Sequence, residues 1–450
     1  MEIAGKNKEN REKFLHGLPS HGKIAGNTGA PWKLGRVMTQ VIITIAAVIL
    51  AAGAVCESRV ITVDDDGPAD FATIQAAIDD SNAGDTVLVA DGTYTGDGNR
   101  DIDFHGKGIT VISENGPENC IIDCNGTEAE PHRGFYFHSG ERQNSMLSGM
   151  TVTNGYAPKG GGVYCKASNP SIEDCVVTRS AAKLGGGIYW EASSSQNVAL
   201  ARCVIMGNAA GIGGGGIWFE RAEGNVENFL IAGNTAVYWG GGVGVWMGDP
   251  LTFEACTFGG NSAEEGGGLW LAMAMLVLRN SILWGDAATT GPEVMSSNPN
   301  SMPPFGNVDI YYCDLEGGLA GVYGYYEWGY GIFFREGNID ADPCFAGPGI
   351  GDYHLKSKGG RWDANEGGWT TDEVTSPCID AGDPMSPIGV EPFPNGGQVN
   401  MGAYGGTAEA SKSYFGEPPC ETIVAGDING DCKVNFLDFA LMALHWMEEH

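Results

Sequence analysis

The stretch GGGIYWE at residues 185–191, with its near copy GGGGIWFE at residues 213–220, decides the fold of this chain. In both, a run of glycines leads directly into a short apolar and aromatic segment. The arrangement occurs five times, with the last glycines at Gly162, Gly187, Gly216, Gly242 and Gly268, at intervals of 25, 29, 26 and 26 residues. A fixed period in this range is typical of a stacked repeat, in which each unit buries its apolar face against the next.

The segment after each glycine run predicts a β-strand, because it is short, rich in Val, Ile, Trp, Tyr and Leu, and bounded by turn residues. The unit contains no helical pattern, so strand and turns at this period predict a parallel β-helix. Glycine accounts for 71 of the 450 residues, but it follows no Gly-X-Y period, which excludes collagen.

Side chains of a strand alternate between its two faces. The first and third places after each glycine run are apolar throughout, so we expect them to point inward. The outward second places are then Tyr164, Tyr189, Trp218, Gly244 and Trp270, and the outward fourth places are Lys166, Glu191, Glu220, Trp246 and Ala272. Because strands in neighbouring coils lie about 4.8 Å apart, the sequence predicts a line of aromatic rings bordered by two carboxylates.

We call this line the aromatic strip and define it as Tyr164, Tyr189, Trp218, Trp246 and Trp270. Aromatic rings on a sheet suit the apolar faces of sugars, and a long strip suits a polymer. The strip is therefore the predicted substrate-binding surface. The alternative is that its rings pack beneath loops inserted before each glycine run.

Glu191 and Glu220 are the candidate catalytic residues, since glycosidases use two carboxylates roughly 5–9.5 Å apart. Two stacked carboxylates equally suit a bound cation or simple solvation. Arg202, Arg221 and Arg279 are possible partners, but none stands in a recognisable catalytic constellation.

Two further columns support the coil register. Asn154, Ser180, Asn208, Asn234 and Asn261 recur at 26, 28, 26 and 27 residues, and stacked amides can hydrogen-bond along a solenoid axis. Three cysteines, Cys175, Cys203 and Cys256, each precede a member of this column by five residues, with Phe229 in the intermediate place. We expect them to fill one interior column rather than a redox or metal site.

Residues 1–56 are predicted to be a leader, with basic residues before the apolar run VIITIAAVILAAGAV at 41–55. A secreted protein with no membrane span in the mature chain follows from this. Three alternatives stay open: a start at Met38, a single anchoring helix, and a lipidated Cys56. The twelve cysteines of a secreted chain permit disulfides.

The formal net charge of −31 argues against nucleic acid and anionic membranes as partners. It favours solubility outside the cell and, where carboxylates cluster, calcium binding. Basic residues are sparse, which counts mildly against polyanionic sugars.

Before the repeats, Phe71, Ile74, Ala77 and Ile78 have helical spacing, with Asp70 or Thr73 as a candidate cap. Strands are expected at 86–90, 109–113 and 120–124. The run FATIQAAI at 71–78 and GTY at 92–94 resemble the N-terminal cap of right-handed β-helix proteins of the pectate-lyase-like superfamily. The resemblance implies an all-β, right-handed parallel β-helix over residues 57–410, with a capping helix.

That superfamily contains lyases, hydrolases, esterases and adhesins, so fold alone assigns no activity. The signature motifs of polygalacturonases, pectin methylesterases and pectate lyases are missing from this sequence. The repeats fade after Trp284. Segments at 338–343, 351–355, 376–382 and 400–406 resemble the closing coils of bacterial β-helix proteins, which implies that they close the C-terminal end.

Residues 411–420 are predicted to be a linker and residues 421–450 a calcium-binding tail. Calcium prefers several oxygens on a compact loop. The predicted ligands occupy positions 1, 3, 5, 7, 9 and 12 of a twelve-residue loop: Asp427, Asn429, Asp431, Lys433 (through its carbonyl), Asn435 and Asp438. The segment resembles a dockerin type I repeat, which implies calcium as cofactor and a cohesin-like module as partner. Dockerins usually carry two repeats and one is present here, so a terminal tag or sorting segment stays open.

Taken together, these patterns predict a secreted β-helix protein that binds extracellular polysaccharide. Whether it also degrades the polymer stays open, and a polysaccharide lyase or a glycoside hydrolase is the expected class if it does. The alternative is a non-catalytic cell-surface, adhesion or scaffold protein that uses the solenoid as a rigid spacer.

Overall fold

The computed structural model describes residues 58–193, 197–297, 306–324 and 331–416, together with residues 426, 428 and 434–446. The chain divides into two units, residues 1–57 and 58–450, and everything below concerns the second. The predicted leader and its alternatives lie outside the described residues. Within the described ranges, no helix is long and apolar enough to cross a bilayer.

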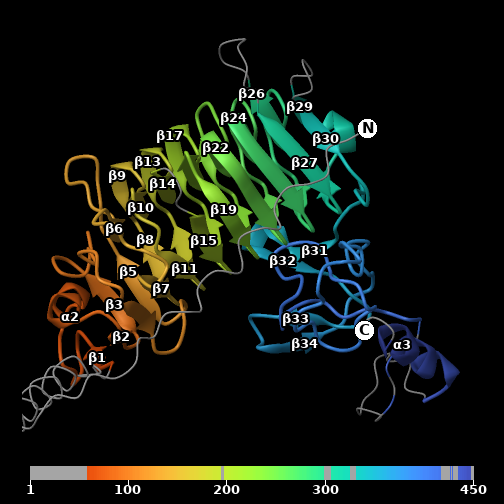
Figure 1. Cartoon of the computed structure of the whole chain (residues 1–450), viewed down its shortest axis with the longest axis horizontal. Helices are drawn as coiled ribbons and strands as arrows, with labels where there is room; N and C mark the ends of the chain where they lie inside the picture. The colour runs from red at the N-terminus through yellow and green to blue at the C-terminus, as the bar shows by residue number, and fades with distance from the viewer. Residues whose placement is uncertain are drawn as a thin grey trace, which may run out of the picture. The chain divides into compact units, whose positions relative to one another are not determined.

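The predicted parallel β-helix is confirmed (Figure 1). Each coil visits three main faces and, in the central coils, a short fourth one. The first face holds β6 (Phe135–Phe137), β10 (Val163–Lys166), β14 (Ile188–Glu191), β18 (Ile217–Glu220), the first parts of β22 (Val243–Glu254) and β24 (Leu269–Arg279), β26 (Val294–Ser297) and β29 (Val322–Gly324).

The second face begins nearest the N-terminus. It holds β1 (Val60–Val63), β2 (Thr86–Val89), β4 (Thr110–Ser113), β7 (Met146–Ser148), β11 (Ser171–Glu173), β15 (Asn197–Ala201), β19 (Glu223–Glu227), the later parts of β22 and β24, β27 (Asn307–Tyr311) and β30 (Ile332–Phe334).

The third face is a separate sheet. It holds β3 (Gly92–Thr95), β5 (Cys120–Asp123), β8 (Thr151–Thr153), β12 (Val176–Thr178), β16 (Val204–Met206), β20 (Leu230–Ala232), β23 (Thr257–Gly259), β25 (Ile282–Trp284) and β28 (Asp314–Leu315). The fourth face is shorter and holds β9 (Tyr156–Lys159), β13 (Ala181–Leu184), β17 (Ala209–Gly213) and β21 (Thr235–Ala236).

The glycine runs link the fourth face to the first, and their sequence has a steric reason. Gly185 adopts a left-handed conformation with φ 63°. A Cβ on Gly186 would lie 2.4 Å from the carbonyl oxygens of Ala209 and Gly215 in the next coil. Only glycine lets backbones approach this closely, so the repeated runs follow directly from the tightness of this turn.

The first and third places after each run face the interior, as predicted. Val163, Ile188, Ile217, Val243 and Leu269 lie in register and are fully buried. The third places, Cys165, Trp190, Phe219, Val245 and Leu271, are fully buried as well. The core is therefore a set of stacked interior columns.

The asparagine column forms the expected ladder. Asn208 Nδ2 donates to Asn234 Oδ1 at 3.1 Å, and Asn234 Nδ2 donates to Asn261 Oδ1 at 3.0 Å. The assignment of Asn154 to this column is wrong. Thr153 pairs with Thr178, so Gly155, rather than Asn154, lies beside Ser180.

The cysteine column is interior, as expected. Cys175, Cys203, Phe229 and Cys256 are buried, and Cys175 N–H donates to Cys203 Sγ at 3.5 Å. The nine cysteines in the described ranges are free thiols, so the permitted disulfides do not form among them. Burial raises the pKa of the Cys256 and Cys313 thiols far above the usual value, which makes these groups unreactive.

The predicted N-terminal helix is α2 (Ile74–Asp80), with Ile74, Ala77 and Ile78 buried against the first coil. Its N-cap residue is Thr73, which makes no side-chain capping bond. Asp70 instead accepts hydrogen bonds from the backbone and hydroxyl of Thr62. The three strands expected before the repeats are confirmed as β2, β4 and β5.

The C-terminal third departs from the prediction in two ways. Coils continue beyond Trp284 through β26 to β30, although the repeat signal has faded. Residues 344–416, which we call the closing module, pack on the outside of the third face instead of forming the expected closing coils. Only the first expected segment, at Ile339, continues a coil, through a bridge to Asp314.

The closing module contains η2 (Pro348–Ile350) and two antiparallel hairpins, β31 (Phe345–Gly347) with β32 (Asp352–Leu355), and β33 (Arg361–Asp363) with β34 (Gly368–Thr370). A short helix, η1 (Gly318–Ala320), lies in the last coils, and α3 (Phe436–Trp446) forms the tail. The module shares an apolar cluster with Leu230, Ala232 and Ile282 of the third face.

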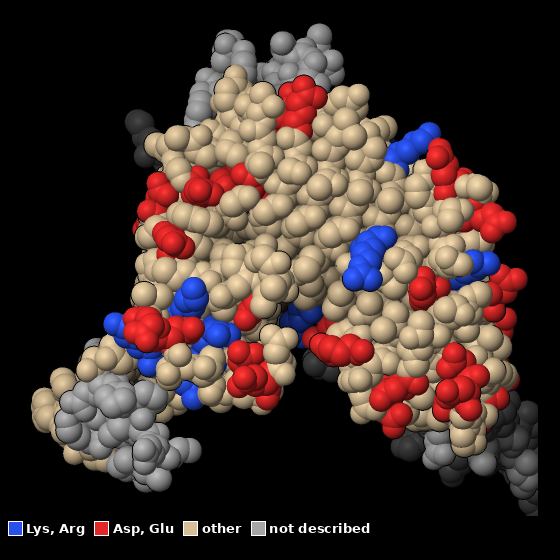
Figure 2. Space-filling model, turned by 180° about the vertical axis from the view of Figure 1, so that it is seen from behind, with Lys and Arg blue, Asp and Glu red and all other residues tan. Residues whose placement is uncertain are grey.

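Two kinds of polar contact fix the module in place. Tyr353 Oη donates to the Gly259 carbonyl at 3.2 Å, and Asn228 Nδ2 donates to the Gly405 carbonyl at 2.8 Å. Ser411 and Ser413 are buried, so the packed chain extends into the predicted linker. Figure 2, which shows the molecule from behind the view of Figure 1, has carboxylates toward both sides of the view and a broad area with few charges between them.

Candidate functional site

The structure brings the aromatic strip together on the outer side of the first face. Tyr164, Tyr189, Trp218 and Trp270 form an apolar cluster that is separate from the interior core. The second place of the β22 coil is Gly244, and the Trp218 ring covers it, since a Cβ there would lie 2.4 Å from that ring. Trp218 consequently stacks on Trp270, two coils away, with ring centroids 5.8 Å apart.

Four of the five strip rings are buried rather than displayed. Tyr164 is 8% exposed, Tyr189 0%, Trp218 4% and Trp270 1%. Leu184 and Trp239 pack against them from the side of the glycine runs. Packing beneath neighbouring segments, the alternative raised from the sequence, therefore describes these four rings.

The partly exposed rings lie at the edge of this cluster. Trp246 and Trp239 stack on Trp270 at centroid distances of 6.1 and 5.3 Å, and both are half-buried. Tyr136 stacks on Tyr164 at 5.1 Å at the other end. We call Tyr136, Trp239 and Trp246 the rim. Sequence reasoning included Trp246 but missed Tyr136 and Trp239, because neither follows a glycine run.

A polar network borders the cluster. Tyr164 Oη donates to Glu191 Oε2 at 2.7 Å, and Tyr189 Oη donates to Glu220. Lys159 Nζ donates to Tyr189 Oη at 2.8 Å and lies 3.3 Å from Glu191 Oε2. Each carboxylate thus accepts a hydrogen bond from a tyrosine hydroxyl of the preceding coil.

Glu191 and Glu220 lie in register on neighbouring strands, as predicted. Their side chains are 26% and 20% exposed. Burial alone raises the pKa of Glu191, but hydrogen bonds from Tyr164 and Lys159 outweigh it and lower that pKa overall. Glu191 is therefore an ionised group at neutral pH, which suits a general base or an ion pair better than a general acid.

The arginines considered from the sequence do not converge on one place. Arg221 lies 3.3 Å from Glu220, Arg202 pairs with Glu173 and Asp174, and Arg279 lies 3.9 Å from Asp383. Only Arg221 therefore touches the candidate site.

Arg133 is a further cation at this site that the sequence did not reveal. Its guanidinium lies over the rings of Tyr136 and Tyr164, at 4.9 and 5.2 Å from their centroids. Burial lowers its pKa, and its Nη1 is buried with no hydrogen-bond partner in the described part of the chain. Arg133 and Tyr136 belong to a coil without a full glycine run, so the sequence repeat did not identify either residue.

The tail can be followed only in part. Of the six predicted calcium ligands, Asp427, Asn429, Asp431 and Lys433 lie outside the described residues. Asp438 is buried and accepts backbone N–H bonds from Ile428 and Asn435, both at 2.7 Å. Asp438 therefore ties residue 428, near the start of the predicted loop, to Asn435 near its end.

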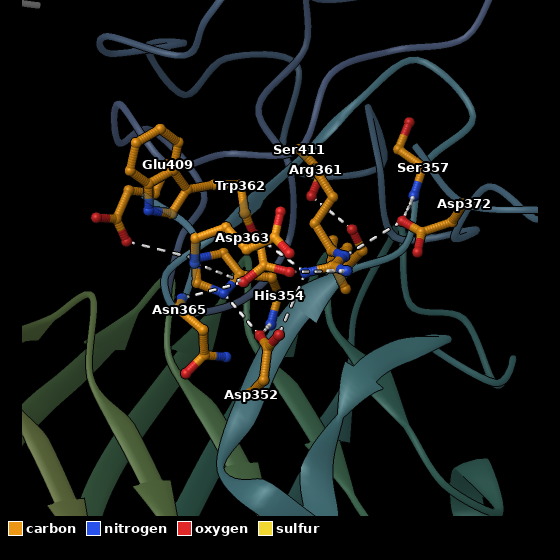
Figure 3. Close-up of polar contacts among 12 residues, drawn as sticks. Asp352, His354, Ser357, Arg361, Trp362, Asp363, Asn365, Asp372, Glu409 and Ser411 are labelled. Atoms are coloured by element: carbon orange, nitrogen blue, oxygen red, sulfur yellow. Dashed lines mark hydrogen bonds and ion pairs between the residues drawn. The ribbon is translucent and has the colours of Figure 1, made fainter. Parts of the chain in front are cut away.

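A second polar cluster lies in the closing module, where sequence reasoning assigned no chemistry (Figure 3). His354 is 3% exposed, with Nδ1 2.8 Å from Asp352 Oδ1 and Nε2 3.4 Å from Glu409 Oε2. Its ring stacks on Tyr404 at a centroid distance of 3.6 Å. Burial alone lowers the pKa of His354, but the hydrogen bonds to Asp352 and Glu409 raise it overall.

Arg361 extends the same cluster into the β33–β34 hairpin. Its Nη1 lies 3.2 Å from Asp352 Oδ2 and its Nε 3.2 Å from Asp372 Oδ2. On the same hairpin, Trp362 and Trp369 are cross-strand partners, and Lys412 Nζ lies 4.0 Å from the Trp369 ring centroid. His354 and Arg361 thus find their carboxylate partners within the cluster, which indicates a structural anchor.

One acidic group in the described ranges has the spacing of a metal site. Asp64, Asp65 and Asp66 bring carboxylate oxygens within 4.8 Å of one another near the N-terminal cap. Asp65 and Asp66 are exposed, and Asp64 Oδ1 accepts the N–H groups of Asp66 and Gly67. These bonds account for the Asp64 geometry as an ordinary turn.

Comparisons with known proteins match two parts of this chain. Residues 75–258 match the family described as right handed beta helix region, and residues 324–382 match the family described as disaggregatase related. Among solved structures, the crystal structure of pectate lyase Pel9A aligns with a TM-score of 0.38 and 16% identity, over 77% of this chain and 96% of that one. A comparison with curated proteins gives no match. The solenoid is a right-handed parallel β-helix.

Proposed function

We propose that this protein is secreted and binds extracellular polysaccharide along the rim of the aromatic strip. The observation that carries the proposal is the cluster of aromatic rings on the outer side of the first face. It is half-buried at Tyr136, Trp239 and Trp246 and is bordered by Glu191, Glu220, Lys159 and Arg133. Partly exposed rings provide faces for sugars, and the polar border provides hydrogen-bonding groups for hydroxyls.

If the bound chain is cleaved, Glu191 and Glu220 are the groups to act on it. Glu191 would serve as base, since its pKa is lowered and it is already ionised. The reaction class would be that of a glycoside hydrolase or a polysaccharide lyase.

The second candidate is a non-catalytic surface or scaffold protein. It is favoured by the burial of Tyr189 and Trp270 and by the pairing of both carboxylates with tyrosine hydroxyls. Groups already satisfied in this way stabilise the solenoid without needing a substrate.

Affinity electrophoresis in gels containing neutral or acidic polysaccharides tests the binding. Trp246→Ala should reduce retardation at least several-fold, whereas Trp369→Ala in the closing module serves as a control of similar chemistry. Equal retardation of wild type and Trp246→Ala would remove the rim from the account.

We also propose that the tail binds calcium through Asp427, Asn429, Asp431, the Lys433 carbonyl, Asn435 and Asp438. A cohesin-like module is the partner that its resemblance implies. Chelation should change the far-ultraviolet circular dichroism of the wild type and leave Asp427→Ala unchanged. An identical response in both proteins would contradict the calcium loop.

A further inference from the structure

Two columns of the solenoid change residue type at the same corner. The asparagine ladder ends in Asp286, whose Oδ1 accepts Asn261 Nδ2 at 2.9 Å and Asn261 N–H at 2.6 Å. The column of third glycines, which includes Gly242 and Gly268, continues at Glu293, since Leu269 pairs with Val294. A Cβ on Gly268 would already lie 2.4 Å from Asp286 Oδ2, so the two columns touch here.

Both acidic side chains are enclosed. Asp286 is 7% exposed and Glu293 1%. Asp286 Oδ2 and Glu293 Oε2 are buried and receive no donor from any other described group. The two carboxyl groups lie close enough to act on each other directly.

Among the described residues, no cation is one of the groups that act most strongly on the pair. Within the described ranges, the other titratable groups that act on the pair are Glu316, which accepts Gly285 N–H at 2.7 Å, and Tyr353, whose phenol lies near Asp286. Two negative charges enclosed together without a cation are very costly, whereas one carboxylic acid donating to one carboxylate satisfies both oxygens.

We propose that Asp286 and Glu293 form a buried carboxyl pair that retains a shared proton in the folded protein and ties the stability of the last coils, β24 to β30, to pH. The pair takes the place of the next ladder amide. It lies between β25 and β26, one coil beyond the last ladder asparagine, Asn261.

The direction of the pH effect follows from burial. Burial raises the pKa of both carboxyl groups, and the charge of Asp286 raises that of Glu293 further. The unfolded groups have pKa values of about 4. The stabilisation is therefore fully present below about pH 4 and is lost as pH rises through the folded values.

Hydrogen–deuterium exchange of peptides from residues 259–297, corrected for the intrinsic rate, tests the proposal between pH 5 and 9. Wild-type protection should fall with pH, by at most about tenfold per pH unit for one proton. Glu293→Gln places an amide donor where the shared proton lies, so its protection should stay constant over this range. Glu264→Gln changes an exposed carboxylate in the preceding coil and should keep the wild-type dependence.

A second variant tests the proposal in case Glu293→Gln does not fold. The double change Asp286→Asn and Glu293→Gly restores the residue types of the preceding coils, and its protection should also be independent of pH. Wild-type dependence in Glu293→Gln or in the double variant would overturn the proposal. A calcium result would also overturn it. If calcium co-purified with the tail variant Asp427→Ala and restored the protection of these peptides at pH 9, the carboxyl pair would hold a cation instead of a proton.

Discussion

At the residue scale, the buried amides of the asparagine ladder each make several hydrogen bonds between coils. Asn234 is fully buried, donates to the Ile205 carbonyl at 2.8 Å and to Asn261, and accepts from Asn208. The Asn208 backbone N–H also donates to Asn234 Oδ1, at 3.0 Å, so the Asn234 side chain makes four hydrogen bonds that join three coils. A buried polar group of this kind is stabilising only while all its partners remain.

We expect Asn234→Ala to destabilise the protein by roughly 3 kcal/mol, since several buried donors and acceptors lose their partner at about 1 kcal/mol or more each. The free energy of unfolding in urea measures this. Asn225→Ala, at an exposed place in β19, should change it by less than about 0.5 kcal/mol. Equal effects of the two changes would contradict the ladder as a source of stability.

The ladder also illustrates what a sequence can reveal about single residues. Spacing alone found Asn208, Asn234 and Asn261, but it placed Asn154 one position away from the true column. It also missed Asp286, because an acid in an amide column breaks the pattern that identifies the column. Strand pairing decides which residues stack in a column. The residue type reveals the column only where every coil uses the same kind of side chain.

At the element scale, the glycine turns control how closely the coils stack. The third glycine of each run packs against the ladder, as Gly242 does beside Asn261. The second packs against the backbone of the next coil, as Gly186 does beside Ala209. The runs are thus the element of sequence that most directly specifies this fold, which explains why the fold could be predicted from them.

Gly186→Ala should destabilise strongly, by about 3 kcal/mol or more, because its Cβ would lie 2.4 Å from two backbone oxygens that cannot move independently. Thermal unfolding measures the loss. Gly349→Ala, where nothing lies within 4 Å of the added Cβ, is the matched control and should be nearly neutral. A tolerated Gly186→Ala would show that the coils are less tightly stacked than described.

The aromatic strip shows the limit of the same reasoning. The alternation of side chains correctly placed Tyr189 and Trp270 on the outer face. It could not predict their burial, because that depends on Leu184 and Trp239 across the short glycine turn. Contacts between faces leave no periodic signal in the sequence.

At the scale of the whole molecule, the closing module covers the third face and is anchored at His354. This imidazole joins β32 to Glu409, 55 residues later in the chain. No repeat or motif predicted this packing, since irregular segments carry little information about which surface they cover. The family match over residues 324–382 includes His354 and Arg361.

Because the pKa of His354 is raised in the folded protein, its stabilisation is present below about pH 6.5 and is lost as pH rises through the folded value. An NMR titration of the His354 ring protons should give a pKa above 6.5. Glu409→Gln should lower this pKa, while Glu366→Gln, at an exposed turn, should leave it unchanged. A pKa at or below 6.5 in the wild type would contradict the anchor.

We propose above all that the outer rim of the β-helix binds a polysaccharide. The most direct test is to incubate the folded protein, with calcium, with a panel of neutral and acidic polysaccharides while measuring both bound sugar and new reducing ends. We expect the wild type to bind at least one polymer and Trp246→Ala to lose that binding. New ends together with the absorbance of unsaturated uronates would identify a lyase, and new ends alone a hydrolase. Retention of none of the polymers by a protein shown to be folded would contradict the claim and favour the scaffold function.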